Sequence, residues 1–510
     1  MKKSNRIQHL LTAGLLLTVV NLFSKLLGFL RDILISNYYG STATTDAFFL
    51  AFSIPTILIG IFTASTDSAI IPQYSRILQS SSNGRLLGDR YFSNIISVLT
   101  LIGSIISLIC LFFPQNIVFL FAPSFRGTQM DLACRYLRLF SFSGVFHIWY
   151  CFFCSYLFCY EKTGPRILLT ALTNVFAVFA LFLWHDENIY GLSLAYLMGS
   201  LLSAVVPIWA SKQIGYRYSL VLSLRRYEFP SFIRLFLPIM GSALLADLLL
   251  YLDRFLASFL PAGNLSALNY ASKVISIFDS ISVVGIGAVL IPVFSRLQAE
   301  KKYSMLRFTS SAVYFCAVLV LLPISIFSIF YANELVSFLY FRGAFTKSAL
   351  QIVSMTFRAY APQILFSPLY TLLVKTLHSI GNTRFPFRVS LFTFIVNACL
   401  SFALTSPLGV SGIALATSVS QILGCGLLFW KISVCLGLAS EFFHPINIWK
   451  LMLCTSAFPI VWMLTPVLGS SFLTLLFAGF GTLALYYFLA VLLFQKELVI
   501  CKHALQKNAA

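Results

Sequence analysis

The stretch Ile71-Pro-Gln-Tyr-Ser-Arg76 recurs 220 positions later as Ile291-Pro-Val-Phe-Ser-Arg296. Three further matches follow in the same order and at almost the same spacing: Arg138-Leu-Phe140 with Arg358-Ala-Tyr360, Gly191-Leu-Ser-Leu-Ala195 with Gly412-Ile-Ala-Leu-Ala416, and Pro165 and Arg166 with Pro386 and Arg388. Four matches in order at a nearly constant offset indicate an internal duplication, so we expect two structurally equivalent halves.

The composition around this repeat is that of a membrane protein. The chain has 510 residues, of which 59% are hydrophobic and only 10% are charged, whereas a soluble domain is about 25% charged. Runs such as Ile95–Phe113 and Thr309–Phe330 are long enough to cross about 30 Å of hydrocarbon. Because these runs are continuously apolar rather than alternating, they favour helices over barrel strands. The sequence therefore predicts an all-α polytopic membrane protein.

The apolar segments predict about fourteen transmembrane helices. We place them near residues 10–37, 45–75, 91–113, 133–159, 166–184, 189–211, 232–260, 266–294, 307–331, 350–378, 386–405, 410–435, 448–468 and 472–495. The first is expected to be a retained helix, because Leu10–Leu30 has no small-residue cleavage site. An even number of six helices in each repeat makes the two repeats parallel. The expected divisions are an N-lobe over 1–215, a C-lobe over 216–440, and an additional helix pair with a cytoplasmic tail over 441–510.

Basic residues mark one side of the membrane. The net charge is +19, and cations gather at the N-terminus (Lys2, Lys3, Arg6), in every second loop, and after the last helix (Lys496, Lys502, Lys507). The positive-inside rule predicts that both termini are cytoplasmic. Because the cations are spread over many loops, the sequence does not predict nucleic-acid binding.

Two stretches concentrate charges inside apolar sequence. The first contains Lys25, Arg31, Asp32, Asp46 and Asp67, and the second contains Asp247, Asp253, Arg254, Lys273 and Asp279. Each charge costs about 2.5–3.5 kcal/mol at the centre of a bilayer, so the cluster predicts a hydrated functional cavity. At an offset of 222, the first three charges align with Asp247, Asp253 and Arg254 with their signs reversed. In transporters built from repeats, such a site lies between the halves near the midplane.

The cations of this cluster suit an anionic ligand. Lys25 and Lys273 lie well within apolar sequence, and a lysine ammonium is a compact point charge for phosphate, whereas Arg31 can bind phosphate through two parallel hydrogen bonds. The alternative is that the charges form structural ion pairs that hold the helices together. Cys151 and Cys154 form a C-x-x-C without a nearby set of metal ligands, so we interpret them as buried hydrophobic residues and expect no metal site.

The first charged stretch also carries a family resemblance. Ser24-Lys-Leu-Leu-Gly-Phe-Leu-Arg-Asp32, Tyr39-Gly40, Thr45-Asp-Ala-Phe-Phe-Leu-Ala-Phe52 and Ile54-Pro55 resemble the opening signature of the MurJ (MviN) lipid II flippases, a family of the MOP exporter superfamily. Gly285-Ile-Gly-Ala-Val-Leu-Ile-Pro292 and Phe341-Arg-Gly-Ala-Phe-Thr346 are similar to further family blocks. The resemblance implies a MATE-like fold in the bacterial inner membrane and alternating access of two lobes around a cationic cavity.

The resemblance also implies roles for individual residues. The flippase would move lipid II, the peptidoglycan precursor, from the cytoplasmic to the outer leaflet. Lys25, Arg31 and Lys273 would bind the diphosphate, and the polyprenyl tail would follow the last two helices. Asp46, Asp32 and Arg254 would gate or orient the site, and Asp67, Asp247, Asp253 and Asp279 are candidates for ion coupling or structural pairs. Lysine replaces the family's arginine at Lys25 and Lys273, and Ser272 stands where the family has aspartate.

Two other function classes compete with this one. Another MOP exporter, either an O-antigen-type flippase or a drug/cation antiporter, is the alternative; antiporters of this kind usually have twelve helices, and a cationic drug favours an acidic cavity. An enzyme would need gathered carboxylates, whereas the loop acids are single: Asp89, Glu161, Glu228, Glu300 and Glu441. We therefore expect no enzyme activity and no cofactor, with transport driven by Na⁺, H⁺ or membrane potential. The expected partners are lipid II, membrane lipids, and cell-wall synthesis or division machinery.

Overall fold

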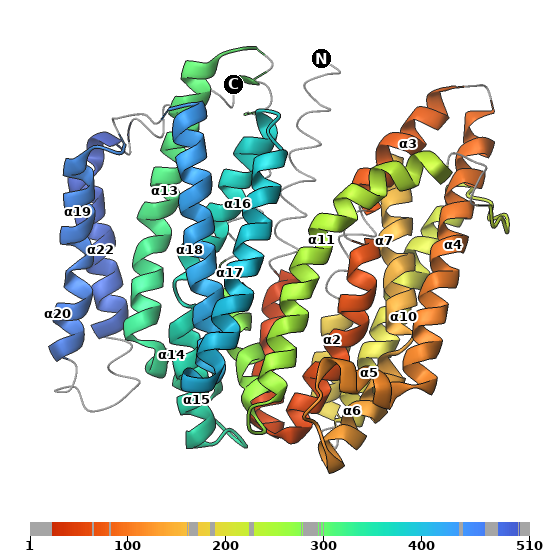
Figure 1. Ribbon diagram of the computed structural model, residues 1–510, viewed down its shortest axis with the longest axis horizontal. Coiled ribbons are helices and arrows are strands. Elements are labelled where there is room, and N and C mark those ends of the chain that lie inside the picture. The colour runs from red at the N-terminus through yellow and green to blue at the C-terminus, as the bar shows by residue number, and fades with distance from the viewer. Residues whose placement is uncertain are drawn as a thin grey trace. The chain divides into compact units, whose positions relative to one another are not determined.

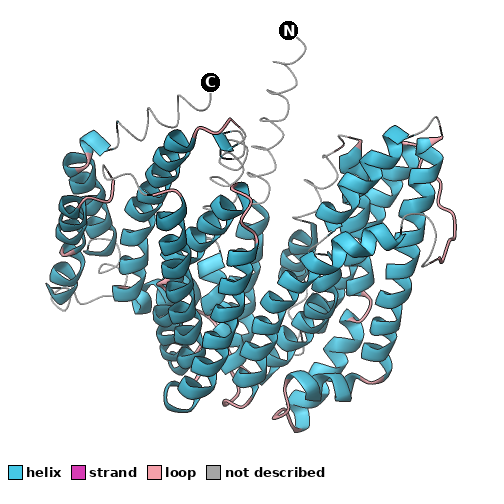
Figure 2. Cartoon of the chain, turned by 45° about the horizontal axis from the view of Figure 1, so that its top comes forward, coloured by secondary structure: helices cyan, strands magenta, loops and turns pink. Residues whose placement is uncertain are grey.

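A computed structural model describes residues 23–63, 66–80, 83–160, 162, 172–183, 189–223, 229–276, 278, 294, 297–298, 300–437, 442–464, 478–497 and 499. Throughout these ranges the chain forms helices joined by turns and short loops, with no strand (Figure 2). Among the described residues, eight helices are long and apolar enough to cross a membrane. The predicted class of multi-pass helical membrane protein is confirmed, whereas the expected number of fourteen crossings is not established by these eight.

The chain divides into two compact units, Met1–Ser266 and Ala267–Ala510. The first unit contains a helical segment over 23–39, followed by α2 (Ala43–Thr63), α3 (Thr66–Ser80), α4 (Gly84–Phe112), α5 (Pro114–Phe121), α6 (Gly127–Phe140), α7 (Ser143–Cys159), α9 (Leu172–Leu183), α10 (Tyr190–Gln213) and α11 (Phe229–Ser258). Helix α11 opens the second sequence repeat, yet it packs against α2 and α3 (Figure 1). The boundary set by packing therefore falls later in the chain than the repeat boundary expected at 215/216.

The core of the first unit is aromatic. Tyr74 of α3, Phe92 of α4 and Tyr156 of α7 are almost completely buried together with Tyr216, which follows α10. The ring centroids of Phe92 and Tyr156 are 4.9 Å apart, and those of Tyr156 and Tyr216 are 5.0 Å apart. Such tilted and edge-to-face pairs stabilise a core beyond the effect of burial alone. This cluster holds α3, α4 and α7 together at one end of the unit.

The second unit continues the helical segment over 264–276 and then contains α13 (Tyr303–Phe330), α14 (Ala332–Tyr340), α15 (Lys347–Tyr360), α16 (Gln363–Ser379), α17 (Arg384–Leu408), α18 (Val410–Cys435), α19 (Pro445–Thr455), α20 (Ala457–Leu464) and α22 (Phe480–Leu493). Helix α13 is buried between two clusters. One cluster joins it to α16 and α18, and the other joins it to α19, α20 and α22. The additional C-terminal helices therefore dock on α13, with α19 and α22 side by side (Figure 1).

The helix bounds confirm the duplication. Helices α6 and α15 both have 14 residues, and α7 and α16 both have 17. Each of the expected helices over 133–159 and 350–378 is interrupted by two residues, at 141–142 and at 361–362, while Gly127–Cys159 remains one candidate membrane span. In the first repeat, the Ser143 hydroxyl donates to the Phe140 carbonyl at 2.6 Å. In the second repeat, Pro362 occupies the break and has no backbone N–H to continue the helix.

Candidate functional site

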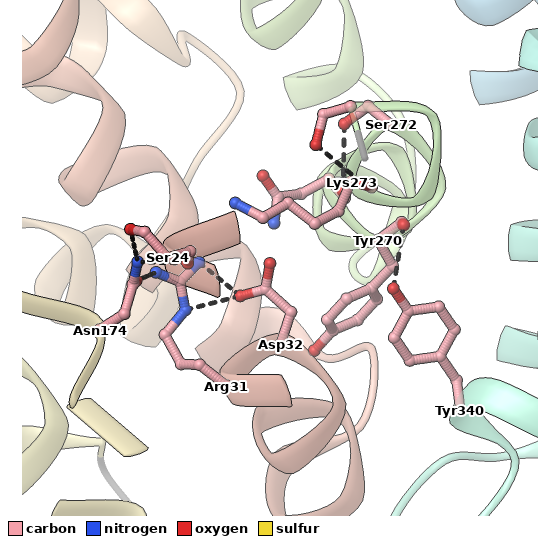
Figure 3. Close-up of polar contacts among 10 residues, drawn as sticks. Ser24, Arg31, Asp32, Asn174, Tyr270, Ser272, Lys273 and Tyr340 are labelled. Atoms are coloured by element: carbon pink, nitrogen blue, oxygen red, sulfur yellow. Dashed lines mark hydrogen bonds and ion pairs between the residues drawn. The ribbon is translucent and has the colours of Figure 1, made fainter. Parts of the chain in front are cut away.

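The helical segment over 23–39 carries a buried ion pair. Arg31 is 5% exposed and Asp32 is fully buried. The Arg31 guanidinium donates to Oδ1 of Asp32 from Nε at 2.7 Å and from Nη2 at 2.6 Å (Figure 3). A carboxylate that accepts from two nitrogens of one guanidinium fixes the orientation of its plane. The predicted phosphate ligand Arg31 is thus held by its own neighbour in the sequence.

Two further helices fix the other side of this guanidinium. Nη1 of Arg31 donates to Oδ1 of Asn174 on α9 at 2.9 Å, and the Asn174 amide donates to the Ser24 carbonyl at 3.1 Å (Figure 3). The Arg31 guanidinium also lies 5.2 Å from the ring centroid of Tyr196 on α10, a cation–π distance. Asn174 therefore links the 23–39 segment to α9 at two points, one turn either side of Gly28. Sequence reasoning missed both Asn174 and Tyr196, because neither is charged.

Lys25 lies on the same segment as Arg31 but in a different environment. Its side chain is exposed, whereas Asp32, two turns later, is fully buried. Lys25 and Asp32 are seven residues apart and so share one helix face, which thus contains one accessible cation and one buried carboxylate. Of the two predicted diphosphate ligands in the first unit, Lys25 is the accessible one and Arg31 is the fixed one.

Asp46 caps a helix that is distant in sequence. It is 2% exposed and lies in the first turn of α2. Its Oδ2 accepts from the Gly263 N–H at 2.6 Å, and its Oδ1 accepts from the N–H and the hydroxyl of Ser266 at 2.7 and 2.6 Å. These donors lie at the N-terminus of the helix over 264–276, where backbone N–H groups lack helical partners and the dipole favours negative charge. Because this helix carries Lys273, Asp46 anchors the start of the helix that presents the third predicted cation.

The turn before this helix requires a glycine. Gly263 has φ of +95°, and a Cβ there would lie 2.6 Å from the Ser41 carbonyl oxygen. The Ser41 hydroxyl donates to the Gly263 carbonyl at 2.6 Å and lies 3.0 Å from the Ser266 hydroxyl. Residues immediately before α2 thus bind the same turn that Asp46 caps.

Lys273 itself lies in the second unit, on the third turn of this helix. Its side chain is half-buried. On either side of it, the Ser272 hydroxyl donates to the Asn269 carbonyl at 3.0 Å, and the Ser276 hydroxyl donates to the Lys273 carbonyl at 2.8 Å (Figure 3). In the same unit the Tyr340 hydroxyl of α14 donates to the Tyr270 carbonyl at 3.2 Å. Ser272, which replaces the family's aspartate, therefore satisfies its hydroxyl within its own helix.

Helix α11 carries three of the predicted charged residues: Asp247, Asp253 and Arg254. An Oδ2 of Asp247 lies 3.2 Å from the position that a Cβ on Gly60 would occupy, so this glycine leaves room for the carboxylate. Asp253 is 9% exposed, and its Oδ1 makes no hydrogen bond to any residue that the structure describes. Arg254 is half-buried.

The remaining predicted acids have different positions. The Ser155 hydroxyl of α7 donates to Oδ1 of Asp67 on α3 at 2.5 Å, so Asp67 joins two helices. Asp279 lies outside the described residues. Within the described part of the chain, no group of three or more histidine, cysteine, aspartate and glutamate side chains could hold a metal ion.

Asp89, which was expected in a loop, lies in α4 and is buried. Its Oδ1 accepts from the Tyr74 hydroxyl at 2.9 Å and from the Tyr156 hydroxyl at 2.8 Å. Tyr160 extends the network, with its hydroxyl 2.8 Å from that of Tyr74. Sequence reasoning missed this cluster, although Tyr156 on α7 and Tyr160 at its C-cap are spaced one helical turn apart. It ties α3, α4 and α7 together.

Comparison with known proteins identifies the family. The family model described as "Lipid II flippase MurJ" matches residues 35–488. The chain belongs to the lipid II flippase MurJ family. The matched range contains the second charged stretch and, from the first, Asp46 and Asp67. Lys25, Arg31 and Asp32 lie just before it. Membership of this family makes the protein a transporter rather than an enzyme.

Relatives of the family cover most of the chain. A "Probable lipid II flippase MurJ" of Buchnera aphidicola subsp. Baizongia pistaciae is 25% identical over 459 residues, which are 86% of this chain and 86% of the relative. A "Lipid II flippase MurJ" of Thermosipho africanus is 25% identical over 83% of this chain and 86% of its own length. The similarity is therefore global rather than confined to one motif.

Solved structures share the fold. A "Lipid II flippase MurJ, inward closed conformation" has a TM-score of 0.80 at 23% identity, covering 94% of this chain and 99% of its own. A multidrug resistance MATE family transporter of the MOP superfamily, in an inward-facing conformation, has a TM-score of 0.66 at 16% identity, covering 82% and 98%. These likenesses confirm the predicted MOP and MATE-like fold.

Proposed function

We propose that this protein translocates lipid II from the cytoplasmic to the outer leaflet of the bacterial inner membrane by alternating access. The observation that carries the proposal is the family match over residues 35–488. The chemistry of the charged helices supports it, because a lipid-linked diphosphate is an anion and these helices present lysine and arginine where apolar sequence surrounds them. Cations in such places are retained for function, since each is costly in a bilayer.

Lys25, Arg31 and Lys273 are the proposed diphosphate ligands. Arg31 is pre-oriented by Asp32 and Asn174, which lowers the entropy lost when a ligand binds. Lys273 depends on Asp46, because the carboxylate fixes the N-terminus of its helix. We assign Asp32 and Asp46 the role of positioning the cations, with Arg254 as a gating residue.

The polyprenyl tail is proposed to contact the C-terminal helices. Trp449 and Met452 of α19 and Met463 of α20 are 72%, 59% and 71% exposed. Phe488 of α22 is 63% exposed. An isoprenoid chain and such a surface are chemically matched, since both are almost entirely apolar.

We further propose that both termini are cytoplasmic and that transport draws on membrane potential, with Na⁺ and H⁺ gradients as the competing sources. A charge that crosses the field gains about 2.3 kcal/mol per 100 mV. Collapsing the potential with valinomycin and K⁺ while holding both ion gradients tests this choice, because continued transport would exclude potential as the driver. Cell-wall synthesis machinery is the proposed downstream partner, since it consumes the flipped lipid.

A complementation experiment tests the function. The protein is expressed in bacteria depleted of their own flippase, and lipid II accessible to an external cleaving toxin is measured. We expect the wild type to restore the accessible pool, and Lys25→Ala and Lys273→Ala to restore much less of it at equal protein levels. Absence of rescue by the wild type would refute the flippase assignment, whereas full rescue by both variants would refute only the site.

A further inference from the structure

Two adjoining cavities in the first unit have no role in the site described above. The first, the apolar cavity, has a volume of about 490 Å³, and its lining includes Leu101 of α4, Trp149 of α7, and Leu220 and Leu222 of the segment after α10. The exposed Lys212, near the end of α10, also lines it. This volume is within the range of about 300–1,000 Å³ that is typical of ligand sites. Tyr218 lines the apolar cavity and also its neighbour.

The second, the basic cavity, has a volume of about 620 Å³ and is lined by Arg85, Arg90 and Arg217. Among the described residues that line it, the acid is Asp89, which is buried and whose Oδ1 already accepts from two tyrosine hydroxyls. Arg85 is held in place, since Nη2 donates to the Ile214 carbonyl and the guanidinium lies 5.8 Å from the Tyr160 ring centroid. In this described lining, three exposed arginines face one carboxylate that is already hydrogen-bonded, so the cavity is complementary to an anion.

The segment over 214–223 that covers both cavities is fixed to α4. The Asn94 amide donates to the Ser223 carbonyl at 2.7 Å, and the Ser223 N–H donates back to the Asn94 oxygen at 2.8 Å. The Tyr218 hydroxyl lies 2.8 Å from the Ser97 hydroxyl. Despite this anchoring, Leu220 is 76% exposed. Because its backbone is fixed while Leu220 remains exposed, this segment is suited to apolar contact with molecules outside the protein.

We propose that the two cavities together bind one anionic phospholipid, with its phosphate in the basic cavity and an acyl chain in the apolar cavity. The basic cavity and the apolar cavity meet at Tyr218. This arrangement matches a lipid, which has a charged headgroup and an apolar chain, whereas a small inorganic anion would occupy only the basic cavity. Tyrosine, tryptophan and arginine are the residues expected at the level of lipid headgroups. Basic pockets between transmembrane helices bind such headgroups.

Native mass spectrometry of the purified full-length protein tests the proposal, with phosphatidylglycerol and phosphatidylcholine as probes. We expect tighter binding of phosphatidylglycerol, and a roughly 30-fold loss for the double variant Arg90→Ala/Arg217→Ala, equivalent to about 2 kcal/mol at about 1 kcal/mol for each basic residue. Arg384→Ala/Arg388→Ala is the matched control, because it removes two exposed arginines from the start of α17 in the other unit. It should leave binding unchanged.

A second variant tests the chain compartment separately. Ser104 of α4 lines the apolar cavity, so Ser104→Phe should fill it and weaken phosphatidylglycerol while leaving the arginines intact. Glycerol phosphate, which has no chain, should not compete. Three results would overturn the proposal: equal affinity for the two lipids, equal losses in the two double variants, or competition by glycerol phosphate at the concentration of the lipid.

Discussion

Removing the Asp46 carboxylate should destabilise the helix that carries Lys273. The carboxylate accepts three hydrogen bonds, from the Gly263 N–H and from the N–H and hydroxyl of Ser266, at 2.6, 2.7 and 2.6 Å. A hydrogen bond to a charged group contributes about 1.5–3 kcal/mol. In Asp46→Asn, the amide oxygen keeps Ser266 while the NH₂ opposes the Gly263 N–H, so we expect a loss of about 1.5–3 kcal/mol. In Asp46→Ala, which leaves two buried N–H groups without an acceptor, we expect about 3–6 kcal/mol.

The free energy of unfolding of the purified protein in detergent measures this loss, and the cellular lipid II assay measures its consequence. Ser266→Ala is the control, because it removes the contacts of the hydroxyl with Asp46, Ser41 and Gly263 but leaves both backbone N–H groups bound to the Asp46 carboxylate. The expected order of damage is Asp46→Ala, then Asp46→Asn, then Ser266→Ala. Transport by Asp46→Asn should fall even where the protein level is normal, since Lys273 is on the affected helix. A variant Asp46→Asn with wild-type stability and transport would refute the capping argument.

Three further predictions concern other contacts. Arg31→Lys keeps the charge but loses the planar guanidinium that binds both Asp32 and Asn174. The rate of lipid II transport should fall at least tenfold, which corresponds to a free-energy difference of about 1.4 kcal/mol. Unchanged transport would mean that the charge alone suffices. Gly263→Ala should reduce the free energy of unfolding by about 1–3 kcal/mol, because the left-handed backbone is unfavourable for alanine and its Cβ meets the Ser41 carbonyl; an unaffected unfolding curve would contradict the observed turn. Asp89→Asn weakens the bonds from two tyrosine hydroxyls, so thermal unfolding should show a loss of about 1–3 kcal/mol without a change in lipid II affinity, and a change in that affinity would point to a functional role instead.

The fold class was predictable because its signal is local. Long apolar runs and low charge require helices in a bilayer whatever their partners are. The internal repeat added the equivalence of α6 with α15 and of α7 with α16, which the helix bounds confirm. The breaks inside those pairs were less predictable, because apolar sequence continues from Phe140 to Ser143, and the hydrogen bond between the Ser143 hydroxyl and the Phe140 carbonyl is visible only in the structure.

The candidate site was predictable in its residue types and not in its contacts. Charges inside apolar sequence identified Arg31, Asp32 and Asp46, since their burial is expensive anywhere in the chain. Their partners were hidden because Asn174 is 143 positions from Arg31, and Gly263 is 217 positions from Asp46. Nothing local marks an asparagine or a backbone N–H as the partner of a distant charge.

The contacts of Asp46 illustrate the difference. A carboxylate at the start of α2 could interact with the dipole of that helix. The carboxylate instead turns to the N-terminus of the helix over 264–276 and binds it directly. Both interpretations use the same physics, and only the tertiary structure decides which helix end the carboxylate serves.

The most direct test of the central claim is lipid II translocation by the purified protein in liposomes that contain no other protein. We predict that lipid II placed in one leaflet reaches the other faster when the protein is present. Lys273→Ala should slow this transfer more than Lys301→Ala does, because Lys301 is a loop residue outside the charged stretches. Translocation no faster than in empty liposomes, with protein of the same orientation and a membrane potential applied, would contradict the account.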